Sequence, residues 1–526
     1  MPTRAASVVS TPSESESPPS LEAHAYPPRR VYSVLGVPPE VQAYALAKYS
    51  RSSQGMLESI QELSAQRAEQ FLDTFYFQYG HRSIADLAHL VFGLEQISIL
   101  AAIAVVDEPV WDGQERSTRY QPFRKTGWHL PREVANTPAA PIFTQTAEGL
   151  LGAYAGLSAA LLEHLIEAVP RPAALTETAY RRTLRARAFD VARSLLPLAT
   201  HTSVGQIVSA RVLEGQISRL LGSPYAELRA VGAELKASCQ DSAIAPLSSE
   251  PQAAAAPTLV KYAEASSYAS RVELDLTHVA DAWLACLGDP ERAEVVELGS
   301  PSSDPLREMV ATVLYRYDQA GHSYRQIQAL VSDLDEARVG EVFDLSIAGR
   351  GSHDDLLREH RAGYALTFDV LVDLGSFRDL HRHRRCVQVR QPLTWTHAFV
   401  APEQVFELGL GGQAAASALD AGLGETYVEA LQKAQHAAQV VRETVESGSA
   451  PAADYLLPLA YRTRCLFKMD WAEAAYIVEQ RTQPQGHFSY RQVAWGMYTQ
   501  LRERYPRLAA PIRAIDPNGP MDLLRR

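Results

Sequence analysis

The most chemically suggestive residues of this chain are basic. His381, Arg382, His383, Arg384 and Arg385 follow one another without interruption. Clustered guanidiniums bind phosphates through paired hydrogen bonds, and they also stack on flat rings. On a strand, Arg382 and Arg384 would face one way and the other three side chains the opposite way. A solvated basic surface is the alternative, because runs of charge usually lie on surfaces.

A second segment, 114–120, carries Glu115, Ser117 and Arg119 at alternate positions, followed by Tyr120. In an extended loop these three side chains would lie on one side, because alternate residues of extended backbone share a face. That side would offer an acceptor, a hydroxyl and a cation, which suits a nucleotide. An ordinary polar loop is the alternative.

Two further segments carry weaker signals. Gly80 and His81 precede Ser83, and Asp86 follows three residues later, a spacing typical of a helix N-terminus capped by Ser83. Arg481 follows Val478 to Gln480 late on what we predict to be the last amphipathic helix of the second half. A lone arginine there is most often a surface residue or an ion-pair partner.

Hydrophobic spacing predicts mostly helical elements that must position these segments. Residues 90–106 are dense in Ile, Leu and Val, and spacing alone does not decide between a buried strand and a helix. Extended segments are predicted at 366–374 and 387–394. Helices are predicted within 41–79, where 64–71 is a strong helix-forming run, and at 147–169, 179–196, 209–221, 422–447 and 471–480.

Two short segments recur in the same order along the chain. Residues 193–202 resemble 454–463, and Lys48-Tyr49 resembles Lys261-Tyr262. The second copy is longer, so it carries an insertion. The predicted organisation is a disordered tail at 1–30, a first unit at 31–240, a linker at 241–258 and a second unit at 259–513, with the insertion at about 284–352.

Composition excludes several classes of protein. The chain has 526 residues and a net charge of −11, which argues against bulk binding to nucleic acid. Its four cysteines are scattered, so we expect no disulfide framework and no metal site, and a reducing cytoplasm fits. We also expect no membrane span, because no uncharged apolar run reaches roughly 18 residues. The N-terminus lacks the apolar core of a signal peptide.

Taken together, the segments resemble the flavin-dependent thymidylate synthase family. The family's motifs are, in order, Gly-His-x-Ser, Arg-His-Arg, Glu-x-Ser-x-Arg-Tyr, Ala-Arg-x-x-Leu-Pro and a final arginine. The resemblance spans about 32–236 and 259–501, and neither half matches fully. The first half keeps Ser83 with Asp86, Glu115, Ser117, Arg119, Tyr120, Arg193 and Arg211. The second half keeps Arg382, His383, Arg384 and Arg481.

The losses in the two halves are complementary. The first half has Asp107, Glu108 and Leu220 where the family has arginine, histidine and arginine, and the second half has Asp454 in place of the arginine before Leu-Pro. Family sites resemble composites of two subunits, so the resemblance implies an internal pseudo-dimer with one complete site. The implied fold is α+β, two tandem copies of helices around a β-sheet. The converse combination, which brings together these substituted residues, is not expected to bind an anionic nucleotide.

The resemblance also implies a reaction and its partners. Reduced FAD supplies a hydride, methylenetetrahydrofolate supplies a carbon, dUMP becomes dTMP, and NADPH reduces the flavin. Arg481 would stabilise charge on the pyrimidine. The implied substrate-binding residues are Glu115, Ser117, Arg119, Arg193, Arg382 and Arg481. The implied flavin-binding residues are Ser83, Glu115, Arg211, Arg382, His383 and Arg384.

Other functions stay open at this point. The substrate could be a pyrimidine nucleotide related to dUMP. The family usually has Gln where this chain has Asp379, and an acid beside a phosphate-bearing substrate is unfavourable. A catalytically inactive protein that binds flavin or nucleotide is therefore the main alternative, and a purely structural helical protein is another. By analogy with four-unit assemblies, two chains would form a pseudo-tetramer with two sites.

Overall fold

The structure of the chain is a computed structural model. It describes residues 32, 34, 36–48, 56–61, 82–123, 127–245, 252–291, 295–299, 304–350, 357–360, 366–510, 512–519 and 523–524. Residues 38–526 form one compact unit, and one buried apolar cluster includes residues of both predicted halves. The tail predicted at 1–30 and the helix predicted at 64–71 lie outside the described residues.

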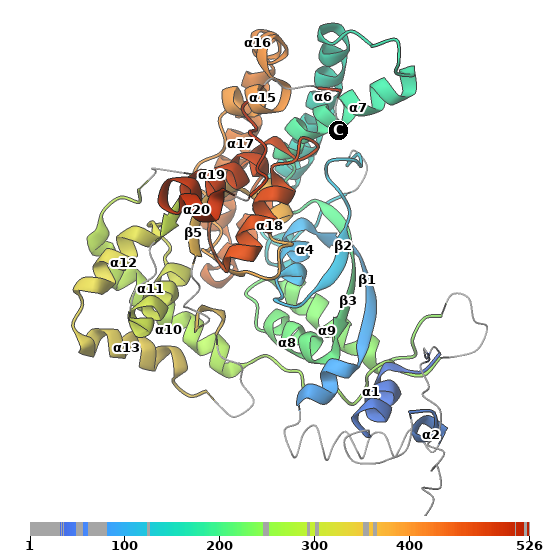
Figure 1. The fold of residues 1–526 in the computed structure, drawn as a ribbon, viewed down its shortest axis with the longest axis vertical. Helices are drawn as coiled ribbons and strands as arrows, with labels where there is room; N and C mark the ends of the chain where they lie inside the picture. Colours follow the sequence, from blue (N-terminus) through green and yellow to red (C-terminus); the bar gives the residue numbers. More distant parts are fainter. Residues whose placement is uncertain are drawn as a thin grey trace, which may run out of the picture. The chain divides into compact units, whose positions relative to one another are not determined.

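The first half contains a three-stranded antiparallel sheet with the order β1-β3-β2 (Figure 1). The strands are β1 (His89–Ser98), β2 (Asp112–Glu115) and β3 (His201–Ser209). Helix α4 (Ile99–Val106) starts directly after β1, where the Ser98 hydroxyl accepts a 2.9 Å hydrogen bond from the backbone N–H of Ala101. The apolar stretch 90–106 is therefore a strand and then a helix, and Ser98 sets the boundary.

The second half contains a four-stranded antiparallel sheet with the order β4-β5-β7-β6. Its last three strands repeat the order of the first sheet. Glu115 at the end of β2 lies opposite Val204, and Arg390 at the end of β6 lies opposite Cys465. The strands are β4 (Val296–Gly299), β5 (Leu366–Asp373), β6 (Val387–Arg390) and β7 (Arg462–Met469). The predicted α+β fold in two tandem copies is confirmed.

The repeated segment identified in the sequence joins the two halves. The backbone N–H of Leu198 donates to the carbonyl of Leu457 at 2.9 Å, and the N–H of Leu459 donates to the carbonyl of Leu196 at 3.0 Å. These two bonds are reciprocal, as in an interface between two identical subunits. The internal repeat is thus a pseudo-dimer within one chain.

The remaining helices confirm most of the predicted helical segments. In the first half they are α1 (Pro39–Lys48), α2 (Met56–Gln61), η2 (Arg82–Leu87), α5 (Arg132–Ala135), α6 (Ala140–Ala168), α7 (Glu177–Ala192), η3 (Arg193–Leu195), α8 (Ala210–Leu221) and α9 (Ala226–Gln240). In the second half they include α14 (Leu374–Leu380), α15 (Pro402–Leu410), α16 (Gly412–Asp420), α17 (Leu423–Thr444), η6 (Ser447–Leu456), α18 (Trp471–Arg481), α19 (Phe488–Arg504) and α20 (Pro506–Ala509).

A helical layer covers one face of the second sheet. It consists of α10 (Ser267–Leu284), α11 (Pro305–Tyr317), α12 (Tyr324–Asp333) and α13 (Glu336–Ile347), with the short turns η4 (Ala285–Leu287) and η5 (Arg358–His360) beside them. Val387, Val389 and Leu466 of the sheet share a buried cluster with these helices. On the first sheet, Val91 and Ile207 lie opposite each other and are 76% and 42% exposed. The helical layer is thus a difference between the described parts of the two halves.

Helix α6 bears on the predicted lack of a membrane span. This 29-residue helix is, by length and composition alone, apolar enough to cross a membrane. Phe143, Tyr154 and Leu161 on its inner face are nonetheless buried, and α6 packs against α7 and α17. Such a helix is also typical of a protein core, so the expected lack of a membrane span stays a prediction.

The boundary region predicted as a linker packs against the first half where it is described. Ala256 is fully buried, and its N–H donates to the carbonyl of Cys239 at 3.1 Å. All four cysteines are unpaired. Among the described residues, no three His, Cys, Asp or Glu side chains are grouped so that they could hold a metal ion.

Candidate functional site

The acid of the first half meets the cations of the second half. Glu115 ends β2, and its side chain is only 5% exposed. Its carboxylate pairs with Arg378 on α14 and lies 3.4 Å from Nη2 of Arg382, in the turn after that helix. The structure therefore brings together two residues that the sequence assigned to one composite site. Glu115, Ser117, Arg119, Arg193, Arg378, Asp379, Arg382, His383, Arg384 and Arg481 are called the arginine cluster below.

Arg119 also bridges the two halves, and it is buried. Its Nε donates to Asp190 of α7 at 2.9 Å, its Nη1 donates to the hydroxyl of Tyr490 on α19 at 3.2 Å, and its Nη2 donates to the carbonyl of Gln485 at 3.1 Å. Burial alone would lower the pKa of Arg119, but the Asp190 carboxylate raises it above its ordinary value. Arg119 is therefore a permanent cation with an internal counter-ion.

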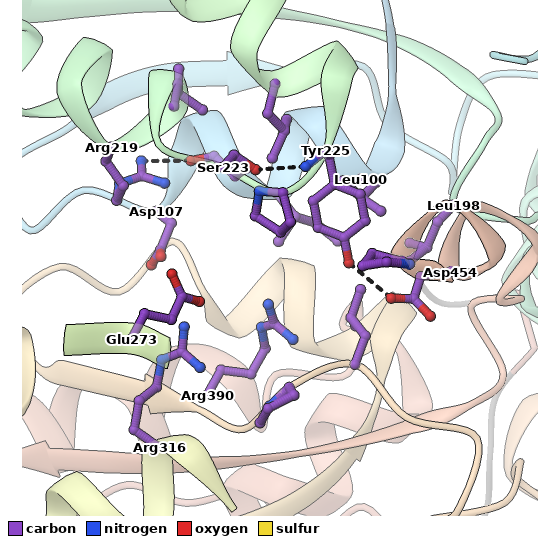
Figure 2. Close-up of a pocket in the computed structure, with 18 of the residues that line it drawn as sticks. Leu100, Asp107, Leu198, Arg219, Ser223, Tyr225, Glu273, Arg316, Arg390 and Asp454 are labelled. Atoms are coloured by element: carbon purple, nitrogen blue, oxygen red, sulfur yellow. Dashed lines mark hydrogen bonds between the residues drawn. The ribbon is translucent and has the colours of Figure 1, made fainter. Parts of the chain in front are cut away.

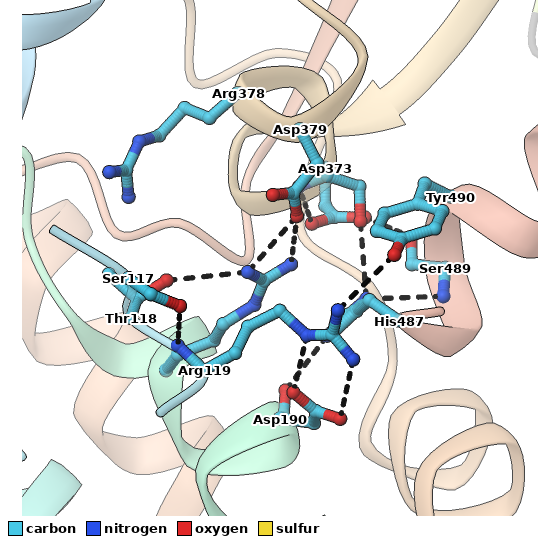
Figure 3. A network of polar contacts seen from close by, with 12 residues as sticks. Ser117, Thr118, Arg119, Asp190, Asp373, Arg378, Asp379, His487, Ser489 and Tyr490 are labelled. Carbon is cyan, nitrogen blue, oxygen red and sulfur yellow. Dashed lines mark hydrogen bonds and ion pairs between the residues drawn. The ribbon is translucent and has the colours of Figure 1, made fainter. Parts of the chain in front are cut away.

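Arg193 is neutralised in the same way, from the opposite half. Its two Nη atoms lie 3.2 and 3.1 Å from one carboxylate oxygen of Asp379, and Nη1 lies 3.3 Å from the Thr118 hydroxyl (Figure 3). Burial raises the pKa of Asp379, but the guanidiniums of Arg193 and Arg119 outweigh this and lower it to about 2. Asp379 is therefore ionised at neutral pH, next to two cations expected to bind a phosphate.

Arg481 lies beside Tyr490 with only a neutral histidine on its Nε. That Nε donates to Nε2 of His383 at 2.7 Å, and burial lowers the pKa of His383 below its ordinary value. The guanidinium carbon of Arg481 is 5.4 Å from the centre of the Tyr490 ring, and that of Arg119 is 5.8 Å from the same centre. The Tyr490 ring thus contacts one arginine from each half, and both distances lie in the range of cation–π contacts.

The other predicted site residues are less closely connected. The Ser117 hydroxyl accepts from the N–H of Arg119 at 3.2 Å, so it stabilises its own turn. Arg384 pairs with Asp112 at 2.9 Å. Arg211 pairs with Asp86 at 2.9 Å, and both side chains are about half exposed. His81 and the side chain of Ser83 lie outside the described residues.

Two details of the sequence interpretation are wrong. Arg382, His383 and Arg384 lie in a turn between α14 and β6 rather than on a strand, because the sheet resumes only at Val387. Arg481 is the last residue of α18, but α18 is not the last helix of its half, since the longer α19 follows it.

Several residues that contact the arginine cluster belong to no sequence motif. Asp190, Thr118 and Tyr490 contact predicted site residues, yet none belongs to a motif described above. Asp190 could have been found by its position near the end of α7, three residues before Arg193, which directly follows that helix. Tyr490 could not, because it reaches Arg119 only through the packing of α19 against the first half.

A cavity of about 510 Å³ lies where the substituted positions of the two halves come together (Figure 2). Asp107, Leu220 and Asp454, which replace family arginines, all line it. Glu108 does not, because it pairs with Arg219 at 2.6 Å. This cavity is called the converse pocket below. Its other charged lining residues are Arg219, Glu273, Arg316, Arg390 and Arg442, and His381 also lines it.

Comparison with known proteins agrees with this architecture. The family described as "Thymidylate synthase complementing protein" matches residues 36–243 and 353–507, one segment in each half. The chain belongs to the thymidylate synthase complementing protein family. The gap between the two matched segments contains most of the helical layer α10–α13, and the two matches fit the tandem duplication seen in the sheets.

Full-length relatives share the two-copy length. A "UPF0159 protein" of Chlamydia muridarum (strain MoPn / Nigg) is 25% identical over 523 residues, covering 92% of each chain. A "UPF0159 protein" of Thermoplasma acidophilum is 27% identical over 511 residues, covering 90% of this chain and 94% of its own. Both matches therefore extend over the two halves of this chain.

Proposed function

We propose that the arginine cluster is the active site of a flavin-dependent thymidylate synthase. The reaction is the reductive methylation of dUMP to dTMP, with FAD as cofactor and methylenetetrahydrofolate and NADPH as co-substrates. Family membership supports the reaction class. The observation that carries the proposal is the pair of Glu115 and Arg382, because an acid kept by one half meets a cation kept by the other.

The donors at the edge of the cluster fit a flavin nucleotide. Arg382 and Arg384 are 32% and 36% exposed, so both reach solvent. The 3.4 Å separation of Arg382 from Glu115 leaves most of its donors available for a pyrophosphate. Bound FAD would supply hydride transfer, a chemistry that protein side chains lack. The contribution of the chain is to bind and orient it through Arg382, His383 and Arg384.

The deeper residues suit the pyrimidine nucleotide. Arg481 keeps both Nη groups for a ligand, because its described polar contact uses Nε. A guanidinium in this position stabilises negative charge that develops on the pyrimidine ring. Ser117, Arg119 and Arg193 would hold the phosphate and sugar. A dianionic phosphate must then displace Asp379 from Arg193, which weakens binding of the nucleotide.

A second candidate is a non-catalytic protein that binds flavin or nucleotide. The observation favouring it is the pairing of Arg193 with Asp379, together with that of Arg119 with Asp190, because both cations already have counter-ions. A site filled by its own ion pairs binds a dianion less tightly than an open one does. Flavin could still bind at the exposed arginines in that case.

Spectroscopy of the purified protein separates the two candidates. Both predict a flavin absorption spectrum after reconstitution with FAD. The enzyme predicts bleaching of that spectrum by NADPH, followed by reoxidation and formation of dTMP when dUMP and methylenetetrahydrofolate are added without oxygen. Bleaching without dTMP would support the non-catalytic protein. Failure to retain FAD would contradict the enzyme and would leave only a non-catalytic protein that binds nucleotide.

We further propose a homodimer in the cytoplasm. Two chains would form a pseudo-tetramer with two arginine clusters. Light scattering after size exclusion should therefore give about twice the chain mass of 57.8 kDa. A monomer that turns over would show that the second chain is not needed.

A further inference from the structure

Arg390 projects into the converse pocket without a carboxylate partner among the described residues. Its hydrogen bond is from Nη1 to the carbonyl of Gln391 at 3.0 Å. The other arginines of the pocket have carboxylate partners: Arg219 lies 2.6 Å from Glu108, Arg442 lies 2.6 Å from Asp454, and Arg316 lies 3.6 Å from Glu359. Burial and the neighbouring Arg316 lower the pKa of Arg390, so the cation is poorly stabilised by the protein alone.

Arg316 reaches the same space from the helical layer. It lies on α11, and its Nε forms an ion pair with Glu359 at 3.6 Å. Burial alone would lower the pKa of Arg316, but Tyr317, Glu359 and Glu273 raise it above its ordinary value. In Figure 2, Arg316 and Arg390 both extend into the pocket, and the carboxylate of Glu273 lies next to the Arg316 guanidinium. Two neighbouring cations repel each other, and an anion bound between them would remove that repulsion.

The rest of the wall is largely apolar. The side chains of Leu100, Ile103, Leu198, Leu374, Phe377 and Leu393 line the pocket. A volume of about 510 Å³ lies within the usual range of small-molecule sites, which combine apolar walls with a few fixed polar groups. The ligand therefore has an apolar body as well as a charge.

The pocket differs from the arginine cluster in the chemistry it offers. Asp107, Leu220 and Asp454 have removed three cations, and Glu273 and Arg316 come from helices that have no described counterpart in the first half. A nucleotide phosphate would meet acids here. Because acids replace two of these arginines, the pocket suits a ligand with a single anionic group, which would lie at Arg390.

We propose that the converse pocket binds a small molecule that carries one carboxylate or phosphate group on an apolar body. Arg316 and Arg390 hold the anionic group, and the leucine and phenylalanine side chains enclose the body. This proposal does not depend on catalysis at the arginine cluster.

Titration calorimetry with simple probes tests the proposal on the full chain. Benzoate and phenyl phosphate are the anionic probes, and benzyl alcohol is the neutral control. At least one anion should bind saturably, with one molecule per chain in addition to any bound at the arginine cluster, and benzyl alcohol should bind about tenfold more weakly or not at all. Saturable binding by neither anion at millimolar concentration would overturn the proposal.

Four variants locate the binding. Arg390→Gln and Arg316→Gln should each weaken the anion by about tenfold. Glu273→Gln removes an acid beside Arg316 and should bind the anion as well or better, which separates the effect from simple misfolding. Arg481→Gln alters only the arginine cluster and should leave the affinity unchanged. Three results would refute the assignment. They are loss of binding in Arg481→Gln, weaker binding in Glu273→Gln, and wild-type affinity in both Arg390→Gln and Arg316→Gln.

Discussion

Glu115 and Arg390 occupy the same position in the two sheets, yet their charges are opposite. Glu115 lies opposite Val204 and joins Arg378 and Arg382. Arg390 lies opposite Cys465 and faces a cavity in which Asp107 replaces the arginine. Because the two halves share one sheet geometry, the different residues at these equivalent positions give the arginine cluster and the converse pocket different charges.

Replacing Arg481 should stop turnover without unfolding the protein. We expect Arg481→Ala to abolish dTMP formation. No other described guanidinium donates to His383, so none can take the place of Arg481 beside the pyrimidine. The cost to stability should be about 1 kcal/mol, since the variant loses one hydrogen bond to His383. Anaerobic turnover assays and urea unfolding measure the two effects. The matched control is Arg513→Gln, an arginine that is 86% exposed, and it should retain full activity.

Removing the acid beside Arg193 should tighten nucleotide binding. In Asp379→Gln the family's usual amide returns, and Arg193 no longer has an internal counter-ion. We expect the affinity for dUMP to rise by about tenfold, because the phosphate no longer competes with a carboxylate. Equilibrium dialysis with labelled dUMP provides the measurement. A lower affinity would mean that Asp379 contributes to nucleotide binding in this chain.

The same acid predicts how stability depends on pH. The pKa of Asp379 is about 2 in the folded chain, below its ordinary value of 3.8. Its contribution, on the order of 2 kcal/mol, is therefore present above about pH 5 and is lost as the pH falls from about 4 to 2. Urea unfolding across this range should show a shallower pH dependence for Asp379→Asn than for the wild type. Identical slopes would show that the ion pair contributes nothing.

Restoring arginine at position 107 should cost stability rather than recover a site. Asp107 pairs with Arg358 and lies 3.4 Å from His381, so Asp107→Arg would place two cations together. We expect roughly 2–4 kcal/mol of destabilisation with unchanged dTMP formation. Asp107→Asn is the milder control. The sequence alone gave no reason to expect a cost, because Arg358 belongs to no recognised motif.

Glu227 should be critical for holding the halves together. Its carboxylate accepts from the N–H and hydroxyl of Ser98 at 2.8 and 2.6 Å, and from the Tyr455 hydroxyl of the other half at 2.9 Å. Glu227→Ala leaves these donors buried without a partner and should cost about 2–4 kcal/mol. Thermal unfolding measures the loss. A change below about 0.5 kcal/mol would contradict this role.

The sequence predicted the composite arrangement because motif residues carry information that does not depend on packing. Glu115 and Arg382 could be assigned to one site from the complementary losses alone. The acids that neutralise the site were harder to predict, since Asp190 and Asp379 act through contacts between segments far apart in the chain. Asp379 was recognisable only as a departure from a family pattern.

Local elements were predictable to different degrees. Long helices such as α6 and α17 have clear spacing, whereas residues 90–106 form both a strand and a helix, divided by the Ser98 cap. The helical layer was seen only as an insertion. Its contribution of Arg316 to the converse pocket depends on tertiary packing, which hydrophobic periodicity does not encode.

The reciprocal bonds between Leu198 and Leu457 and between Leu459 and Leu196 have an evolutionary consequence. In an assembly of identical subunits, every mutation appears in all copies, so each position must serve every site at once. Covalent fusion of the copies ends that constraint. Each half can then specialise. A position such as 390 can then acquire a function that the equivalent position 115 does not have.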